Sequence, residues 1–412
     1  MGRYLDQLDT VAPDRRWAMV RGWLLGEPLP FFAELRAERP VLVLPDVTLA
    51  TRYHDCAAIL HRHKDFGVDL YRPKQGDYFM AQDDTADHWR DKSIMKSILD
   101  FEQVPAMRAF VGKTTNDILD AAGCSIDAPK QLTRAVPIAL VQRFFGFDGS
   151  DPNKLLAWSY WNQQDAFHNQ PFDIDVPDPD HIVAERKRAN IHLAFYVGRL
   201  VAKRAVQAKL GARKDDPVSR LIRLSFTGAL NFPLKKVLFN VGGLLIGAVE
   251  TTSHTVNNAI AELFRHPAVL DRARAAARED DPTKFDGYVF EALRFNPAFP
   301  YFFRTCHRST LLASGTPFAT EVEPGTTVLA VTHSAMFDEA AFPDAERFNP
   351  VRSPGDTFTF GYGIHECLGR AVAAAMVPEI VRQCLCRTDF HPESAPIFEG
   401  GVPEHYRLAW RD

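Results

Sequence analysis

One cysteine stands in a segment whose residues could make it a metal ligand. The segment runs from Phe360 to Arg370 and reads Phe-Gly-Tyr-Gly-Ile-His-Glu-Cys-Leu-Gly-Arg. Residues 371–377 are apolar and rich in alanine, so we expect a helix to start at Cys367. A helix N-terminus offers unpaired N–H groups and a partial positive charge, which favour a thiolate. The glycines permit unusual backbone angles, and Gly369 leaves room beside the sulfur.

In isolation, Cys367 would be interpreted as a buried free cysteine. Its neighbours favour another interpretation, because Phe360, Gly363, Cys367 and Gly369 follow the pattern Phe, two residues, Gly, three residues, Cys, one residue, Gly. The segment resembles the haem-ligand loop of the cytochrome P450 family, the haem-thiolate monooxygenases, in its soluble bacterial form. The resemblance implies haem b as cofactor, Cys367 as the ligand of its iron, and the other three residues as parts of the haem-binding loop.

A second motif combines an acid and a hydroxyl within an apolar helical pattern. Glu250 is a charged residue in an apolar stretch, which is unfavourable unless it is paired, and Gly247 weakens the helix. A kinked helix with Glu250 at a solvent-facing seam would explain both. The segment also resembles the family's oxygen-activation motif, with Ala248 in place of the usual glycine. The resemblance implies that Glu250 and Thr251 deliver protons for oxygen activation, and that Gly247 and Ala248 face the haem.

A third motif places Glu291 and Arg294 three residues apart on one helix. Most such pairs are solvated surface pairs that contribute little to stability. At this place in the order of motifs, the pair resembles the family's Glu-x-x-Arg. The resemblance implies a structural role for Glu291 and Arg294, in which they reach a third residue within 346–350.

Haem carries two carboxylates, which need donors or cations in a buried site. His88 and Lys92 are four residues apart on a predicted helix and therefore share a face. The family usually has Arg at the second of these positions, so Lys92 keeps the charge without the bidentate geometry. Arg304 and His365 match two further family positions. Each residue alone would be taken as a surface residue, but together they predict a site for the haem propionates.

The substrate pocket is predicted to be mainly apolar. The resemblance implies that Phe299 and Pro300 approach the distal haem face, together with Gly243, Ile246 and Gly247 from the long helix. Phe79, with its neighbours 78 and 80, falls in the family's substrate-covering region. No charged side chain stands out in the sequence as a substrate anchor.

These motifs require a mainly helical chain with a minor β region, an α+β fold. Helical patterns cover residues 54–62, 86–100, 104–122, 131–145, 152–166, 181–210, 233–265, 267–279, 283–295 and 367–386. Residues 40–53 alternate as a β-hairpin, 328–331 resemble a strand, and 343–355 resemble irregular coil. The resemblance implies the cytochrome P450 fold, with haem between the long central helix and the cysteine-loop helix. We expect one domain over residues 1–412.

Composition limits the remaining possibilities. The formal charge of −4 gives no basic footprint for nucleic acid. The six cysteines include no Cys-x-x-Cys pair, so neither a disulfide framework nor a zinc ribbon is expected. The longest uncharged apolar run, residues 241–249, is about half a membrane span, and no signal peptide is evident. We therefore expect a cytoplasmic protein without a membrane span.

The leading hypothesis for function is a monooxygenase acting on a small-to-medium hydrophobic substrate. It would use O2 and two electrons from a separate ferredoxin or flavodoxin and its NAD(P)H reductase, because the chain beyond the cysteine segment is short for a further domain. A peroxide-driven peroxygenase, or a hydroperoxide-rearranging enzyme, is one alternative, although such family members tend to lack the acid–alcohol pair. A non-catalytic haem carrier or sensor is another, and an all-helical scaffold without haem is the least favoured.

Overall fold

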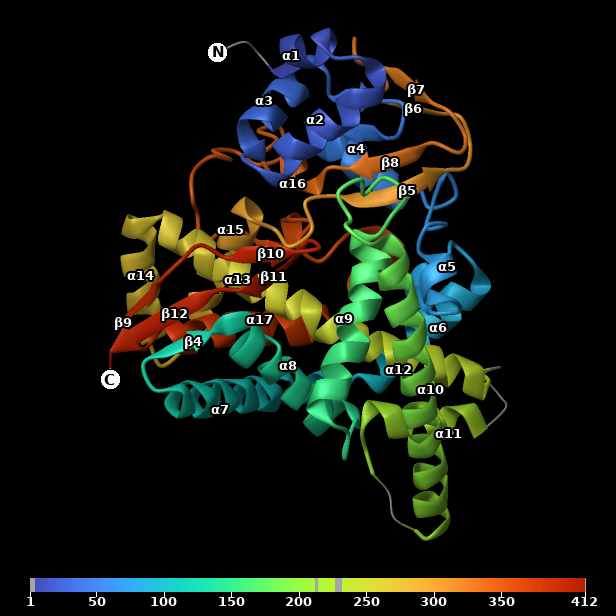
Figure 1. Ribbon diagram of the computed structural model, residues 1–412, viewed down its shortest axis with the longest axis vertical. Coiled ribbons are helices and arrows are strands. Elements are labelled where there is room, and N and C mark those ends of the chain that lie inside the picture. Colours follow the sequence, from blue (N-terminus) through green and yellow to red (C-terminus); the bar gives the residue numbers. More distant parts are fainter. Residues whose placement is uncertain (1–3, 212–213, 227–231, 412) are drawn as a thin grey trace.

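The computed structural model describes residues 4–211, 214–226 and 232–411. Helices dominate, and small sheets lie beside them (Figure 1). The helices are α1 Tyr4–Thr10, α2 Pro13–Leu25, α3 Pro28–Glu38, α4 Tyr53–His61, α5 Arg72–Gln75, α6 Ala86–Ile98, α7 Val104–Ala122, α8 Ala135–Leu140, α9 Pro152–His168, α10 Pro179–Lys209, α11 Pro217–Phe226, α12 Leu234–Ala248, α13 Glu250–Arg265, α14 Pro267–Ala277, α15 Thr283–Phe295, α16 Thr332–Ala335 and α17 Arg370–Leu385.

Twelve strands form four small sheets in the described part of the chain. Their bounds are β1 Val41–Val43, β2 Thr48–Ala50, β3 Phe66–Gly67, β4 Ser125–Asp127, β5 Phe302–Cys306, β6 Thr310–Leu312, β7 Thr320–Val322, β8 Thr327–Ala330, β9 Thr388–Pro392, β10 Ile397–Glu399, β11 Val402–His405 and β12 Arg407–Arg411. The largest sheet has the order β1-β2-β8-β5-β3 and contains the predicted hairpin, in which Val41 pairs with Ala50. The predicted fold class, mainly α with a minor β region, is therefore confirmed.

Three of the predicted helices differ from expectation in ways that matter for the site. The pattern over 233–265 forms two helices, because Val249 interrupts the path between α12 and α13. Residues 131–145 form α8 between two π-helical turns, Pro129–Thr133 and Val141–Phe145. The last helix begins at Arg370, three residues after Cys367, so the cysteine precedes the helix.

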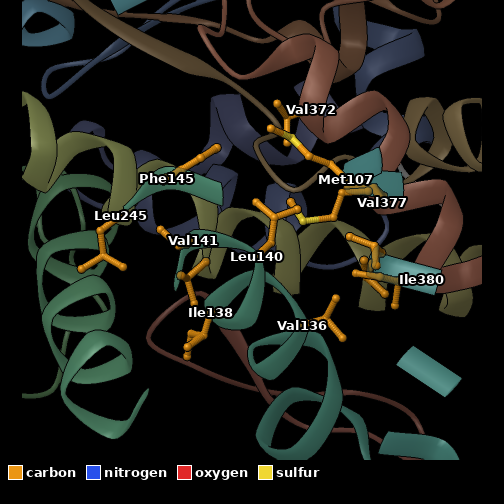
Figure 2. Close-up of a cluster of buried hydrophobic side chains, with 14 of the residues drawn as sticks. Met107, Val136, Ile138, Leu140, Val141, Phe145, Leu245, Val372, Val377 and Ile380 are labelled. Atoms are coloured by element: carbon orange, nitrogen blue, oxygen red, sulfur yellow. The ribbon is translucent and has the colours of Figure 1, made fainter. Parts of the chain in front are cut away.

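The main core lies between the helices that follow the β-hairpin in the sequence. Figure 2 shows Met107 of α7 near Val372, Val377 and Ile380 of α17, with the side chains of α8 beside them. Helices α9 and α10 lie side by side and pack on α12 (Figure 1). Burial of these side chains fixes α12, α13, α15 and α17 around one another. None of the described helices is both long and apolar enough to span a bilayer.

Candidate functional site

A large cavity of about 800 Å³ lies between these helices and the sheet. Its wall includes Cys367 on one side and residues of α9, α10 and α12 elsewhere. Apolar and aromatic side chains form most of the remaining wall, as is usual for sites that bind small molecules. The cavity brings together many of the residues singled out in the sequence: Gly243, Ile246, Gly247, Ala248, Thr251, Phe299, Arg304, Phe360, His365, Cys367 and Gly369.

The Cys367 loop is closed by its own backbone. The N–H of Cys367 donates to the carbonyl of Phe360 at 2.8 Å, and Gly361 adopts a φ of +73° that favours glycine. A side chain at Gly369 would stand 3.9 Å from the Cys367 sulfur, in ordinary contact. The Phe360 ring lies between Arg370, 5.7 Å from its centroid, and the ring of Phe290. These contacts hold the sulfur at the cavity wall.

Cys367 does not lie at the start of a helix, contrary to the prediction that a helix N-terminus favours its thiolate. Burial raises the pKa of the Cys367 thiol above its ordinary value, and this effect outweighs the others. The backbone N–H of Gly369 opposes it by hydrogen bonding to the sulfur, and the charge of Lys92 also lowers this pKa. Because α17 begins only at Arg370, the favourable contact comes from the turn before the helix.

Thr251 lies on the cavity wall at the interruption between α12 and α13. Its hydroxyl donates to the carbonyl of Gly247 at 2.6 Å, one turn earlier in the chain. Ala248, which replaces the family's usual glycine, also lines the cavity. The hydroxyl oxygen can still accept a hydrogen bond from a group inside the cavity.

Glu250 points away from the cavity into a buried ion pair, and not to a solvent-facing seam. Its Oε2 accepts from the Nε of Arg134 at 3.0 Å, and the two Nη atoms of Arg134 bind Glu404 at 3.0 and 2.6 Å. Oε1 of Glu250 is buried without a hydrogen-bond partner among the described residues. Burial, opposed by Arg134, raises the pKa of Glu250 to about 7.

A basic edge of the cavity combines Arg304 of β5 with His365. Arg304 is buried and lies beside Tyr71, with which it interacts, while its Nη1 donates to the carbonyl of Phe303. The Nδ1 of His365 is buried without a hydrogen-bond partner among the described residues. Burial lowers the pKa of His365 well below its ordinary value, and the nearby charges of Arg304 and Lys92 add to this effect. At this edge, the Nδ1 of His365 and the Arg304 guanidinium are therefore available to bind an acceptor group or an anion.

Two of the four predicted propionate partners lie outside the cavity wall. Lys92 donates to the carbonyls of Ile364 and Glu366 and faces a smaller neighbouring cavity. The Nδ1 of His88 lies 2.8 Å from the carbonyl of Phe79, and its ring is 5.1 Å from that of His365. From positions off the cavity wall, Lys92 therefore supports the cysteine loop and His88 packs beside His365.

Three further residues singled out in the sequence lie off the cavity wall. Phe79 is fully buried in the main core, while its neighbours Tyr78 and Met80 line the cavity, because successive residues of a tight turn point in different directions. Pro300 is not part of the wall, and its carbonyl accepts from the N–H of His333 at 2.9 Å. Gly363, with a φ of +70°, faces α4 instead, where an added Cβ would stand 2.6 Å from the Leu60 carbonyl.

The remaining pocket residues, Gly243, Ile246 and Phe299, lie on the wall. A Cβ at Gly243 would overlap the ring of Tyr78 at 2.2 Å, so this glycine makes space for an aromatic wall residue. Phe299 packs against Phe167 and Phe302.

Glu291 and Arg294 form a buried pair with a structural role, and not a solvated pair at the surface. Arg294 donates to Glu291 at 3.0 and 2.7 Å and to the carbonyls of Met336 and Ala345. From residues 346–350 only backbone groups reach the pair, including the N–H of Asn349 at 3.0 Å from Glu291. The third side chain is Arg352, whose Nε lies 3.5 Å from Glu291 and which falls two residues beyond the predicted range.

Several wall and network residues were not identified from the sequence: Tyr71, Lys74, Arg134, Arg186, Arg352 and Glu404. Arg352 lies just beyond the predicted range 346–350, while the others come from segments far from the motifs. Arg186 is in a run of charged residues without a distinguishing spacing. The buried charge of Glu250 predicted a partner in principle, but no signal indicated that it would be Arg134.

The residues around the cavity fit the haem that the resemblance implies. A free thiol faces the cavity, as a thiolate ligand requires. The unpartnered Nδ1 of His365 and the buried Arg304 offer partners for carboxylates at one edge. Aromatic and aliphatic residues, among them Phe360, Leu244 and Val372, supply an apolar wall for a flat macrocycle.

Comparison with known proteins agrees with this fit. The family profile "Cytochrome P450" matches residues 41–399. Erythromycin C-12 hydroxylase of Saccharopolyspora erythraea is 28% identical over 333 residues, which cover 78% of this chain and 77% of that protein. Cytochrome P450 monooxygenase PikC of Streptomyces venezuelae is 26% identical over 378 residues, covering 88% and 84%.

The solved structure of cytochrome P450 CYP109Q5 from Chondromyces apiculatus has a TM-score of 0.77 with this chain at 21% identity, and the match covers 95% of this chain and 96% of that one. At this identity the likeness shows the fold, while the family profile spans most of the sequence. The chain therefore belongs to the cytochrome P450 family, and it is a monooxygenase that binds haem b.

Proposed function

We propose that this enzyme inserts one oxygen atom from O2 into a small-to-medium hydrophobic substrate, using two electrons from a separate ferredoxin or flavodoxin and its NAD(P)H reductase. The observation that carries the proposal is the position of the Thr251 hydroxyl on a largely apolar cavity wall that also contains Cys367. Bound haem supplies the oxygen chemistry, and a cysteinate ligand increases electron density at the iron. The printed names of the relatives, a C-12 hydroxylase and a monooxygenase, support this reaction class.

Thr251 and Glu250 are proposed to handle the protons. The Thr251 hydroxyl donates to the Gly247 carbonyl at rest, and it can turn its proton into the cavity when an acceptor arrives. Glu250 lies next in the chain with a pKa of about 7, which suits a group that takes up and releases protons near neutral pH. Its unpartnered Oε1 is the atom on which the proton would be held.

The other site residues have positioning roles in this proposal. Cys367 would bind the iron, with Phe360 and Gly369 around the sulfur and Gly247 and Ala248 on the α12 side. Arg304 and His365 would bind the propionates, while His88 and Lys92 hold the loop from behind. Gly243, Ile246 and Phe299 would contact substrate. We also propose that the chain is a single domain, since residues from Leu60 to Val377 line one cavity. We propose separately that the enzyme acts in the cytoplasm.

The test replaces Thr251 by Ala in the haem-loaded enzyme. A substrate is first chosen by its effect on the visible absorption of the wild-type haem. With a surrogate ferredoxin system, we expect the variant to keep haem, its carbon monoxide complex and NADPH consumption. Product formed per NADPH should fall by about tenfold or more, with hydrogen peroxide replacing it, because a proton donor is missing.

Thr255→Ala is the matched control, because Thr255 also lines the cavity and donates to the backbone carbonyl of Thr251 at 2.6 Å. It should couple electrons to product nearly as the wild type does. Full coupling in Thr251→Ala would remove the proposed role of Thr251. Product formation with peroxide but not with O2 and electrons would instead identify a peroxygenase.

A further inference from the structure

The charged side chains on the cavity wall are all positively charged. Lys74, Arg186, Lys235 and Arg304 line the cavity, and among the described residues of the wall there is no Asp or Glu. Arg304 belongs to the basic edge at the haem end. Lys235 is an exposed residue whose Nζ lies 2.7 Å from Asp77. Lys74 and Arg186 remain, and neither has a part in the chemistry described above.

Lys74 and Arg186 share one carboxylate. Asp165 of α9 is fully buried, and its two oxygens lie 3.2 Å from the Nζ of Lys74 and 2.6 Å from the Nε of Arg186. Lys74 also donates to the carbonyls of Asp165, at 2.7 Å, and Asn169. Its three donors are therefore used. Two cations therefore share the Asp165 carboxylate, while Asp173 is a second carboxylate that acts on Lys74.

The terminal guanidinium nitrogens of Arg186 are free. The side chain is 14% exposed and lines the cavity, but its two Nη atoms donate to no residue that the structure describes. The Nε of Arg186 forms an ion pair with Asp165 without a hydrogen bond, and the planar Nη pair stays available for a second acceptor group. That pair matches the two oxygens of a carboxylate.

Neutral polar residues of α9 and α10 line the same cavity as Arg186. Gln163 is 1% exposed and lines the cavity, and its Oε1 has no hydrogen-bond partner among the described residues. Asn162 of α9 and Asn190 of α10 form a hydrogen bond of 2.8 Å, and both residues line the cavity. A buried amide without a partner is unfavourable unless a ligand satisfies it.

We infer that Arg186 is a specificity residue that binds a carboxylate on the substrate, so that the substrate class is an apolar carboxylic acid. The Oε1 of Gln163 is an acceptor and is therefore available only to a donor group elsewhere on a ligand. The inference rests on the proposed function for what happens after binding. The apolar part of such an acid would lie along the aromatic wall. The unpaired Nη atoms of Arg186, on a wall that has no Asp or Glu among the described residues, favour an anion over a neutral ligand of equal size.

The test compares two probes of equal chain length, decanoate and decanamide, by calorimetric titration of the haem-loaded enzyme. The wild type should bind decanoate about tenfold more tightly than decanamide, which corresponds to about 1.4 kcal/mol. Arg186→Gln should remove this preference, and Arg186→Lys should keep part of it. The control Arg188→Gln, on a side chain that is 68% exposed on the same helix, should change neither affinity.

Equal binding of the two probes by the wild type would overturn the inference, and so would a preference that survives in Arg186→Gln. The readout does not depend on turnover, so it separates this site from the proposed function. A carboxylate preference that depends on Arg186, in an enzyme that fails to oxygenate the bound acid with O2 and electrons, would support the site and count against the proposed function alone.

Discussion

Two buried glutamate–arginine pairs lie on neighbouring helices and differ in one respect. Glu291 of α15 accepts from Arg294 with both oxygens and from the N–H of Asn349, and Arg352 lies 3.5 Å away. Glu250 of α13 accepts from Arg134 with one oxygen, and its other oxygen is buried without a partner among the described residues. Both glutamates are almost completely buried.

The difference shows how the number of donors decides what a buried carboxylate can do. A carboxylate with donors on both oxygens is held in its charged form and fixes the elements that supply those donors. A carboxylate with one donor has an oxygen that a proton can occupy, and burial raises its pKa towards neutrality. We therefore assign the Glu291 pair to structure and the Glu250 pair to proton handling, and the predictions below test that contrast.

The largest effect is expected for Glu291→Gln. This change leaves the fully buried Arg294 without its counter-ion, and a broken buried pair destabilises a protein by about 3–5 kcal/mol. Urea denaturation of the haem-loaded enzyme, followed by fluorescence and haem absorption, measures the loss.

The control is Glu185→Gln, which removes the half-buried partner of the exposed Arg188 at the same three-residue spacing. Its effect should stay within about 0.5 kcal/mol, as for most surface changes. An equal loss in both variants would mean that the Glu291 pair has no special structural role.

These pairs also show what the sequence could and could not predict. The order and spacing of Cys367, Glu250 and Glu291 predicted the fold and the elements around the cavity, because short motifs lie within one helix or loop. Neither the partners of these glutamates, Arg134 and Arg352, nor the partner of Asp165, Arg186, could be predicted, because contacts between distant segments depend on the packing of whole helices. Phe79 lies off the cavity wall for a related reason, since turn geometry decides which neighbour faces the cavity.

A smaller, pH-dependent effect is expected for Glu250→Gln. The pKa of Glu250 is about 7 in the folded protein against an ordinary value of 4.5, so the folded state holds the proton more tightly between these pH values. The free energy of unfolding must then fall as pH rises through this window, by about 3 kcal/mol in all. The glutamine variant lacks this contribution.

The measurement is the free energy of unfolding of wild type and Glu250→Gln at several pH values from about 5 to 8. The wild type should lose stability relative to the variant as pH rises, with the difference levelling off above the folded pKa. A difference that does not depend on pH, or that grows in favour of the wild type, would show that Glu250 does not hold a proton in this pH range.

The smallest effect concerns Glu404, the second carboxylate on Arg134. Glu404 binds both Nη atoms of Arg134, and its charge raises the pKa of Glu250, although less than burial does. Glu404→Gln should therefore lower the pKa of Glu250, by under about one unit, because Arg134 is then left with a single counter-ion. The midpoint of the pH-dependent loss of stability, compared with that in the double variant Glu404→Gln/Glu250→Gln, measures the shift. Glu399→Gln, at an exposed position on the paired strand β10, should leave the midpoint unchanged. A midpoint that moves upward in Glu404→Gln would mean that Glu404 positions Arg134 for Glu250, so that the three residues act as one unit and the contrast with the Glu291 pair depends on all of them.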